Sequence, residues 1–158
     1  MTDEARQQFT ADWVRAMATV LLTRRSDLTL AETKQGTGLD LHVYIDREDK
    51  PMRLMFGVLL RGVPALATVE HANQVLGPTL GQFQGMRKFT YPVCLLFFTM
   101  RDERAYFSWL AEPTVTDHGP KLVHHSKASC VEFTDELLAE VVERIVGWYD
   151  AVETVLIA

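Results

Sequence analysis

Two segments of this sequence, Met52–Leu60 and Val93–Thr99, are apolar at almost every position. A strand with apolar side chains on both faces needs a covering layer on each side, as the central strands of a sheet have. Neither segment approaches the roughly 20 apolar residues that a membrane-spanning helix requires. We therefore expect both segments to be buried central strands of one sheet.

A hairpin partner for the first of these strands precedes it in the chain. From residue 39 to residue 46, aliphatic residues alternate with polar or aromatic ones, which is the period of a β-strand. Charged residues and then a proline follow, so a turn is predicted at Asp46–Pro51. The pattern predicts a hairpin with strands at 39–46 and 52–61.

Helical spacing of apolar residues predicts a helix near each end of the chain, over residues 3–22 and 134–156. Thr134 is a candidate N-cap for the second helix, and Phe133 and Leu138 are spaced for a hydrophobic staple. The apolar stripe of the first helix consists of Phe9, Trp13, Met17, Val20 and Leu21. The stripe of the second consists of Leu138, Val141, Ile145, Trp148, Val152 and Val155.

Between these helices the sequence predicts further strands and an interrupted helix. The helical pieces are predicted from Thr68 to Leu76 and from there to about Lys88. Pro113–Ser129 is predicted to be a loop, with at most a short strand at Leu122–Val123. The further strands are expected near residues 28–33, 92–99 and 104–110.

The expected fold class is α+β, with the order αβββαβ(β)α and helices that flank a mixed sheet. With 158 residues and an apolar fraction of 47%, the chain is expected to form a single domain over residues 1–158. The predicted core residues are Trp13, Met17, Val43, Phe56, Val58, Leu95, Phe97, Leu138, Val141 and Ile145.

The composition limits the possible environments and partners. The acidic, polar N-terminus is unlike a signal peptide, and the two separate cysteines, Cys94 and Cys130, favour reduced thiols in a cytoplasmic protein. The net charge is −5 and no segment forms a basic cluster, whereas proteins that hold duplex DNA usually present a basic stripe. We expect weak or no binding to nucleic acid and no membrane association.

Three local motifs resemble those of the PD-(D/E)XK restriction-endonuclease-like superfamily, and especially those of a bacterial branch of unknown function. Gly38-Leu39-Asp40 lies where that family has its strand acid, and Val58–Gly62 lies where a valine-glutamine-x-lysine-glycine string ends the next strand. Pro92–Phe98, followed by a charged turn and Tyr106–Trp109, resembles a hairpin of that branch. The resemblance covers roughly residues 5–110 and implies a restriction-endonuclease-like fold.

The resemblance also implies a metal site, in which two carboxylates, or a carboxylate and a glutamine, hold a divalent ion beside a lysine. Asp40 keeps the first acid, Leu59 replaces the second ligand, and Arg61 replaces the lysine. Because magnesium needs several oxygen ligands, we expect these positions to be vestigial, with no catalysis, no metal and no cofactor. In the alternative of an active site, Glu4 or Glu32 would supply the second carboxylate for Mg²⁺.

Asp40 and Arg61 also have structural interpretations. Asp40 could pair with Arg61 across the two strands or cap the glycine-containing loop at 34–38, and Arg61 could form an ion pair or contact a phosphate. The loosely grouped His118, His124 and His125, with Cys130, match no zinc spacing, so we expect solvated loop histidines.

Three functions from different classes are open. The first is a nuclease-fold domain without catalysis that binds a protein partner or itself, as a homodimer, with Tyr106, Trp109 and Tyr149 as the possible interaction surface. The second is a magnesium-dependent DNA endonuclease with a relocated acid. The third is a small acidic dimeric secretion chaperone, a class that shares the α-β-β-β-α-β-β-α order. The missing second ligand favours the first.

Overall fold

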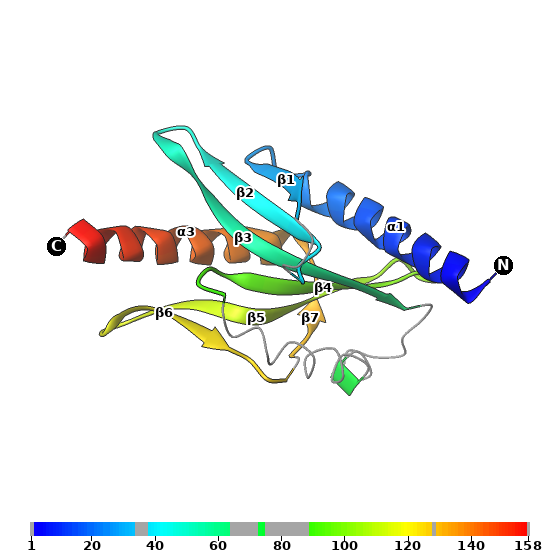
Figure 1. Ribbon diagram of the computed structural model, residues 1–158. Helices are drawn as coiled ribbons and strands as arrows, with labels where there is room; N and C mark the ends of the chain where they lie inside the picture. The colour runs from blue at the N-terminus through cyan, green and yellow to red at the C-terminus, as the bar shows by residue number, and fades with distance from the viewer. Residues whose placement is uncertain (1, 34–37, 64–72, 75–88, 128, 158) are drawn as a thin grey trace.

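The computed structural model describes residues 2–33, 38–63, 73–74, 89–127 and 129–157, and its named elements are two long helices and a series of strands (Figure 1). The helices are α1 (Asp3–Leu22) and α3 (Asp135–Ile157). The strands are β1 (Leu28–Glu32), β2 (Leu41–Arg47), β3 (Lys50–Val63), β4 (Val93–Thr99), β5 (Ala105–Thr116), β6 (Gly119–His124) and β7 (Val131–Glu132).

The strands form one open mixed sheet, which confirms the predicted α+β class. Its order is β1-β2-β3-β4-β5-β6, and the short β7 pairs with β5. The pair β3–β4 is parallel and the other pairs are antiparallel. The two segments that are apolar at almost every position therefore lie side by side at the centre of the sheet, as the sequence predicts. The helical pieces predicted between Thr68 and Lys88 lie largely outside the described residues, of which 73–74 are helical.

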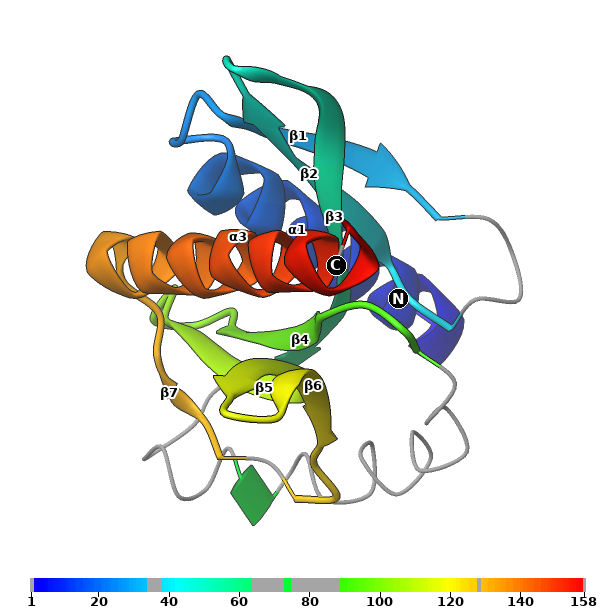
Figure 2. The same cartoon turned by 90° about the vertical axis from the view of Figure 1, so that its left-hand side faces the viewer.

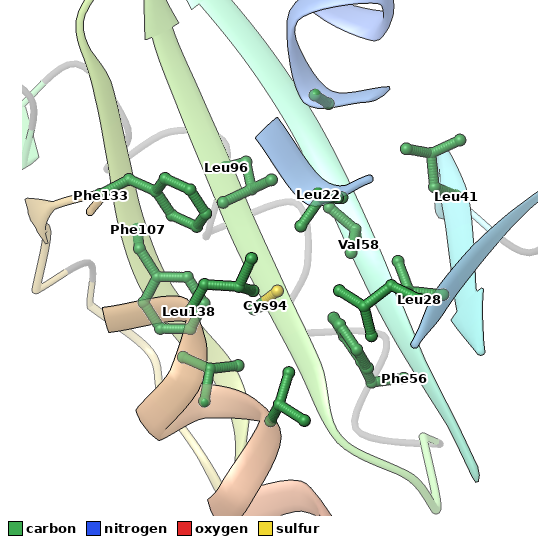
Figure 3. Close-up of a cluster of buried hydrophobic side chains, with 14 of the residues drawn as sticks. Leu22, Leu28, Leu41, Phe56, Val58, Cys94, Leu96, Phe107, Phe133 and Leu138 are labelled. Atoms are coloured by element: carbon green, nitrogen blue, oxygen red, sulfur yellow. The ribbon is translucent and has the colours of Figure 1, made fainter. Parts of the chain in front are cut away.

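The helices α1 and α3 both cover the same face of the sheet (Figures 1 and 2). The register of β2 against β3 places Val43 opposite Phe56 and Leu41 opposite Val58, and these side chains form one face with alternate residues of β4. The side chains of this face and those that pack on it from the two helices form the first core cluster (Figure 3). Its buried members include Leu22, Leu28, Leu41, Phe56, Val58, Cys94, Leu96, Phe107, Phe133 and Leu138.

The opposite face of the sheet carries a second core cluster. Its buried members are Leu39, Leu59, Val93, Leu95, Phe97, Tyr106, Leu110, Ala111 and Cys130. Because successive side chains of a strand point to opposite faces, β4 contributes to both clusters, and all of its residues are buried.

Most of the predicted core is confirmed, but the buried stripe of α1 differs from the prediction. Its buried residues are Val14, Ala18 and Leu22, whereas Phe9 and Val20 are each 55% exposed. Trp13 and Met17, both predicted to be core, lie at the border of the first core cluster and are partly buried. A stripe of small residues can approach the sheet more closely than one that contains tryptophan and phenylalanine.

The segment after residue 110 is the main correction to the predicted strands. Pro113–Ser129 is a loop only in part. The strand β5 continues to Thr116, and β6, which contains the short strand predicted at Leu122–Val123, returns antiparallel to it. The β-branched run at 114–116 suits a strand. Gly119 has a φ of 101°, a conformation that glycine adopts without the cost of a Cβ, so it allows the tight turn between the strands.

Cys94 and Cys130 are both buried free thiols. Burial raises the pKa of the Cys94 thiol and raises the pKa of Cys130 to about 11. Neither described helix is both long enough and apolar enough to cross a bilayer.

Candidate functional site

Asp40 lies where β2 begins, and β3 extends past it. Its backbone N–H donates to the Val58 carbonyl at 3.0 Å, and its side-chain Oδ2 accepts from the Leu60 N–H at 2.7 Å. The carboxylate therefore continues the hydrogen-bond ladder of β2 by one step. This bond gives Asp40 a structural role that needs no ligand.

Arg61 lies beside the same carboxylate. Its Nη1 is 3.6 Å from Asp40 Oδ2 and donates to the Leu60 carbonyl at 2.7 Å. The side chains of Arg61 and Asp40 are 39% and 33% exposed, so water screens the ion pair and its contribution to stability is small. The pairing across the strands that the sequence allowed is present, and part of the guanidinium remains accessible.

Leu59 points away from this pair into the second core cluster. Its side chain is 1% exposed, and Leu95 is its partner in the register of β3 and β4. The position that corresponds to a metal ligand in the resemblance therefore belongs to the interior of the protein.

The two alternative acids do not complete a metal site with Asp40. Glu4 is exposed in the first turn of α1. Glu32 pairs in register with Leu41, the neighbour of Asp40, but its Oε1 is bound by Arg15 Nη1 at 3.0 Å. Among the described residues, no group of three histidine, cysteine, aspartate or glutamate side chains converges on a possible metal position.

A cleft of about 390 Å³ opens between α1 and the C-terminal end of β3, and Asp40 and Arg61 lie in its wall. The helix contributes Arg6 and Arg15, so three arginines from two distant segments of the sequence, α1 and β3, line the cleft. The other lining residues are Gln7, Thr10, Ala11, Val14, Leu60 and Gly62. Sequence reasoning identified Asp40 and Arg61 and missed the two arginines of α1, which no motif marks.

Gly62 determines how closely α1 crosses β3 at this cleft. A Cβ at this position would lie 2.4 Å from Val14 Cγ2 and 3.3 Å from Thr10 Cγ2. The first of these distances is far below van der Waals contact, so a larger residue would force Val14 or the helix to move. The walls of the cleft are therefore fixed by packing between residues about fifty positions apart in sequence.

The three residues predicted to form an interaction surface are largely engaged within the protein. Tyr106 is 3% exposed and belongs to the second core cluster. Trp109 packs against the first core cluster, beneath the guanidinium of Arg144, which lies 5.5 Å from the centroid of its ring. The Tyr149 hydroxyl donates to the Met55 carbonyl at 2.5 Å.

The histidines grouped in the sequence are separated by the structure. His118 lies in the turn before β6 and His124 ends that strand, so β6 lies between them. His125 Nε2 lies 2.7 Å from Glu112 Oε1, and the Cys130 N–H donates to Asn73 Oδ1 at 2.8 Å. These contacts are structural, and the four residues do not form a zinc site.

Comparison of the chain with protein-family models, with curated proteins and with solved structures finds no match.

Proposed function

We propose that this chain is a non-catalytic domain with a restriction-endonuclease-like fold, which acts by binding a protein partner or by assembling with itself. The observation that carries the proposal is that the side chains at the expected metal-ligand positions of the β2–β3 hairpin already have structural contacts. The carboxylate of Asp40 is engaged by the Leu60 N–H and Arg61, and Leu59 is enclosed in the core.

The ligand count supports the absence of catalysis. Magnesium takes near-octahedral oxygen coordination and loses its waters reluctantly. A single aspartate would leave the ion almost fully hydrated, so it would neither position a phosphate nor hold a hydroxide for attack. Leu59 has no oxygen to offer, and Arg61 does not deprotonate near neutral pH.

The topology supports the fold part of the proposal. The meander β1-β2-β3 precedes a strand that joins β3 in parallel, and α1 packs against the meander. This arrangement is compatible with the αβββαβ order that the sequence motifs suggested.

The test is a cleavage assay with supercoiled plasmid in the presence of magnesium or manganese. We expect no nicked or linear product from the wild-type protein. Metal-dependent cleavage that Asp40→Ala abolishes would overturn the proposal. Because Asp40 holds the end of β3, thermal unfolding of Asp40→Ala must show that this control variant remains folded.

Light scattering at several protein concentrations distinguishes the two modes of action. A mass that rises with concentration toward twice the chain mass of 17.9 kDa indicates self-association. A constant monomer mass assigns the function to a different protein partner.

A further inference from the structure

The cleft between α1 and β3 is locally basic in a protein that is acidic overall. Its lining includes Arg6, Arg15 and Arg61 but one carboxylate, that of Asp40. Among the described residues Arg6 has no ion-pair partner, and the 3.6 Å contact of Arg61 with Asp40 is long. Arg15 is bound by Glu32, whose side chain is 82% exposed. The cleft therefore presents a surplus of positive charge, although the whole chain carries −5.

We infer that this cleft binds an acidic segment of a partner protein, whose carboxylates contact Arg6 and Arg61. This inference rests on the proposed function, because it names the chemistry of the protein partner. Guanidinium groups bind carboxylates through paired hydrogen bonds in a plane, and clusters of arginine are a recurrent device for acidic motifs.

The other walls of the cleft suit a peptide chain. Gln7 and Thr10 on α1 add polar side chains between the arginines, while Ala11 supplies exposed apolar surface. Arg6 and Arg15 are the first and last cleft residues of the helix, so the charges lie at the borders of the lining and the apolar residues lie between them. A segment with acidic residues around a small apolar residue complements this pattern.

The net charge favours a short peptide over nucleic acid. At physiological salt, charges more than about 8 Å apart in solvent are largely screened, so a short peptide in the cleft experiences chiefly the arginines. A duplex extends well beyond the cleft and also meets the acidic surface, and its affinity depends on many phosphate contacts.

The inference is tested by fluorescence anisotropy with a labelled short peptide of glutamate and leucine. A counterpart peptide in which glutamine replaces every glutamate is the neutral probe. We expect saturable binding of the acidic peptide, weaker binding at higher salt, and no binding of the neutral peptide. The double substitution Arg6→Gln and Arg61→Gln should weaken binding by about tenfold or more, since each arginine loses a charge-assisted contact.

Arg53→Gln is the matched control for a general charge effect. Arg53 is an exposed arginine of β3 that pairs with Asp46, and it lies eight residues along the strand from Arg61 and does not line the cleft. Its substitution should change the affinity by less than about twofold, because exposed and distant charges interact weakly. Circular dichroism establishes that all variants retain the fold.

Three results would overturn the inference. They are equal binding of the acidic and neutral peptides, an equal loss of affinity in Arg53→Gln, and tighter binding of a labelled DNA oligonucleotide than of the acidic peptide. The plasmid assay separates this inference from the proposed function. If neither peptide binding nor cleavage is found, this inference alone fails, whereas cleavage that depends on Asp40 removes the proposed function.

Discussion

At the scale of single residues, two glycines of this chain have opposite surroundings. Gly62, in β3, has no room for a Cβ, which would lie 2.4 Å from Val14 Cγ2. Gly147, in the exposed side of α3, has no atom within 4 Å of the position of a Cβ. Packing against Val14 favours the first glycine, whereas the second weakens a helix and no contact among the described residues explains it.

The two glycines therefore predict opposite effects of alanine. Gly62→Ala should lower the free energy of unfolding by about 1–3 kcal/mol, because the added methyl group overpacks the crossing of α1 and β3. Gly147→Ala should raise it by about 0.5–1 kcal/mol, because alanine loses less backbone entropy in a helix. Urea denaturation measures both, and a Gly62→Ala variant as stable as the wild type would contradict the close crossing.

At the scale of elements, Glu112 ties β5 to α3 and to the segment after β6. Its Oε2 accepts from Arg144 Nη2 at 2.6 Å, and its Oε1 lies 2.7 Å from His125 Nε2. Burial raises the pKa of Glu112, but the hydrogen bonds from Arg144 and His125 outweigh this effect and hold the pKa below its usual value of 4.5. The folded state therefore favours the ionised carboxylate more than the unfolded state does.

This difference predicts a loss of stability in acid that depends on Glu112. Because the folded pKa is lower than the unfolded one, the contribution is present above about pH 4.5 and is lost as the pH falls through the folded pKa. Glu112→Gln should cost about 1–2 kcal/mol at neutral pH, and the difference from the wild type should shrink in acid.

Urea denaturation across this pH range measures the effect of Glu112. Glu143→Gln, an exposed change on α3 at a residue with no ion pair among those described, is the control and should stay within about 0.5 kcal/mol of the wild type. A difference between Glu112→Gln and the wild type that does not vary with pH would contradict the assignment.

At the scale of the whole molecule, the interior holds groups that resist ionisation. Burial raises the pKa of Tyr149 from 10.0 to about 12, and it also raises the pKa values of the two thiols. For each group the folded pKa exceeds the unfolded one. Their contributions to stability are therefore present at neutral pH and are lost in alkali, where the unfolded chain releases protons first.

Tyr149→Phe tests this behaviour. At neutral pH the variant should lose about 0.5–1.5 kcal/mol, because the bond to the Met55 carbonyl is removed. Between pH 10 and 12 the wild type should lose stability more steeply than the variant, since the variant has no phenol to ionise there. Denaturation curves at several alkaline pH values provide the measurement, and parallel losses in the two proteins would exclude Tyr149 as a source of the pH dependence.

The positions of most elements could be predicted because they depend on local patterns. Helical spacing predicted 3–22 and 134–156, and α1 and α3 occupy 3–22 and 135–157. The predicted loop at Pro113–Ser129 was too long, and the short strand predicted within it at Leu122–Val123 is only the middle of β6. The sequence signal of these strands is weak, and their pairing with each other stabilises them. The exposed Phe9 shows a limit of helical periodicity. The spacing predicts which side of a helix is apolar, but it does not predict where that helix contacts the sheet.

The sequence by itself determined the α+β class and the central apolar strands, because these follow from residue type and short-range spacing. Only the tertiary structure decided that both described helices share one face of the sheet, and that Arg6 and Arg15 line a cleft with Arg61. The physical reason is that such contacts depend on where α1 crosses β3. That crossing is set by the fit of Val14 against Gly62, and no local pattern of the chain encodes it.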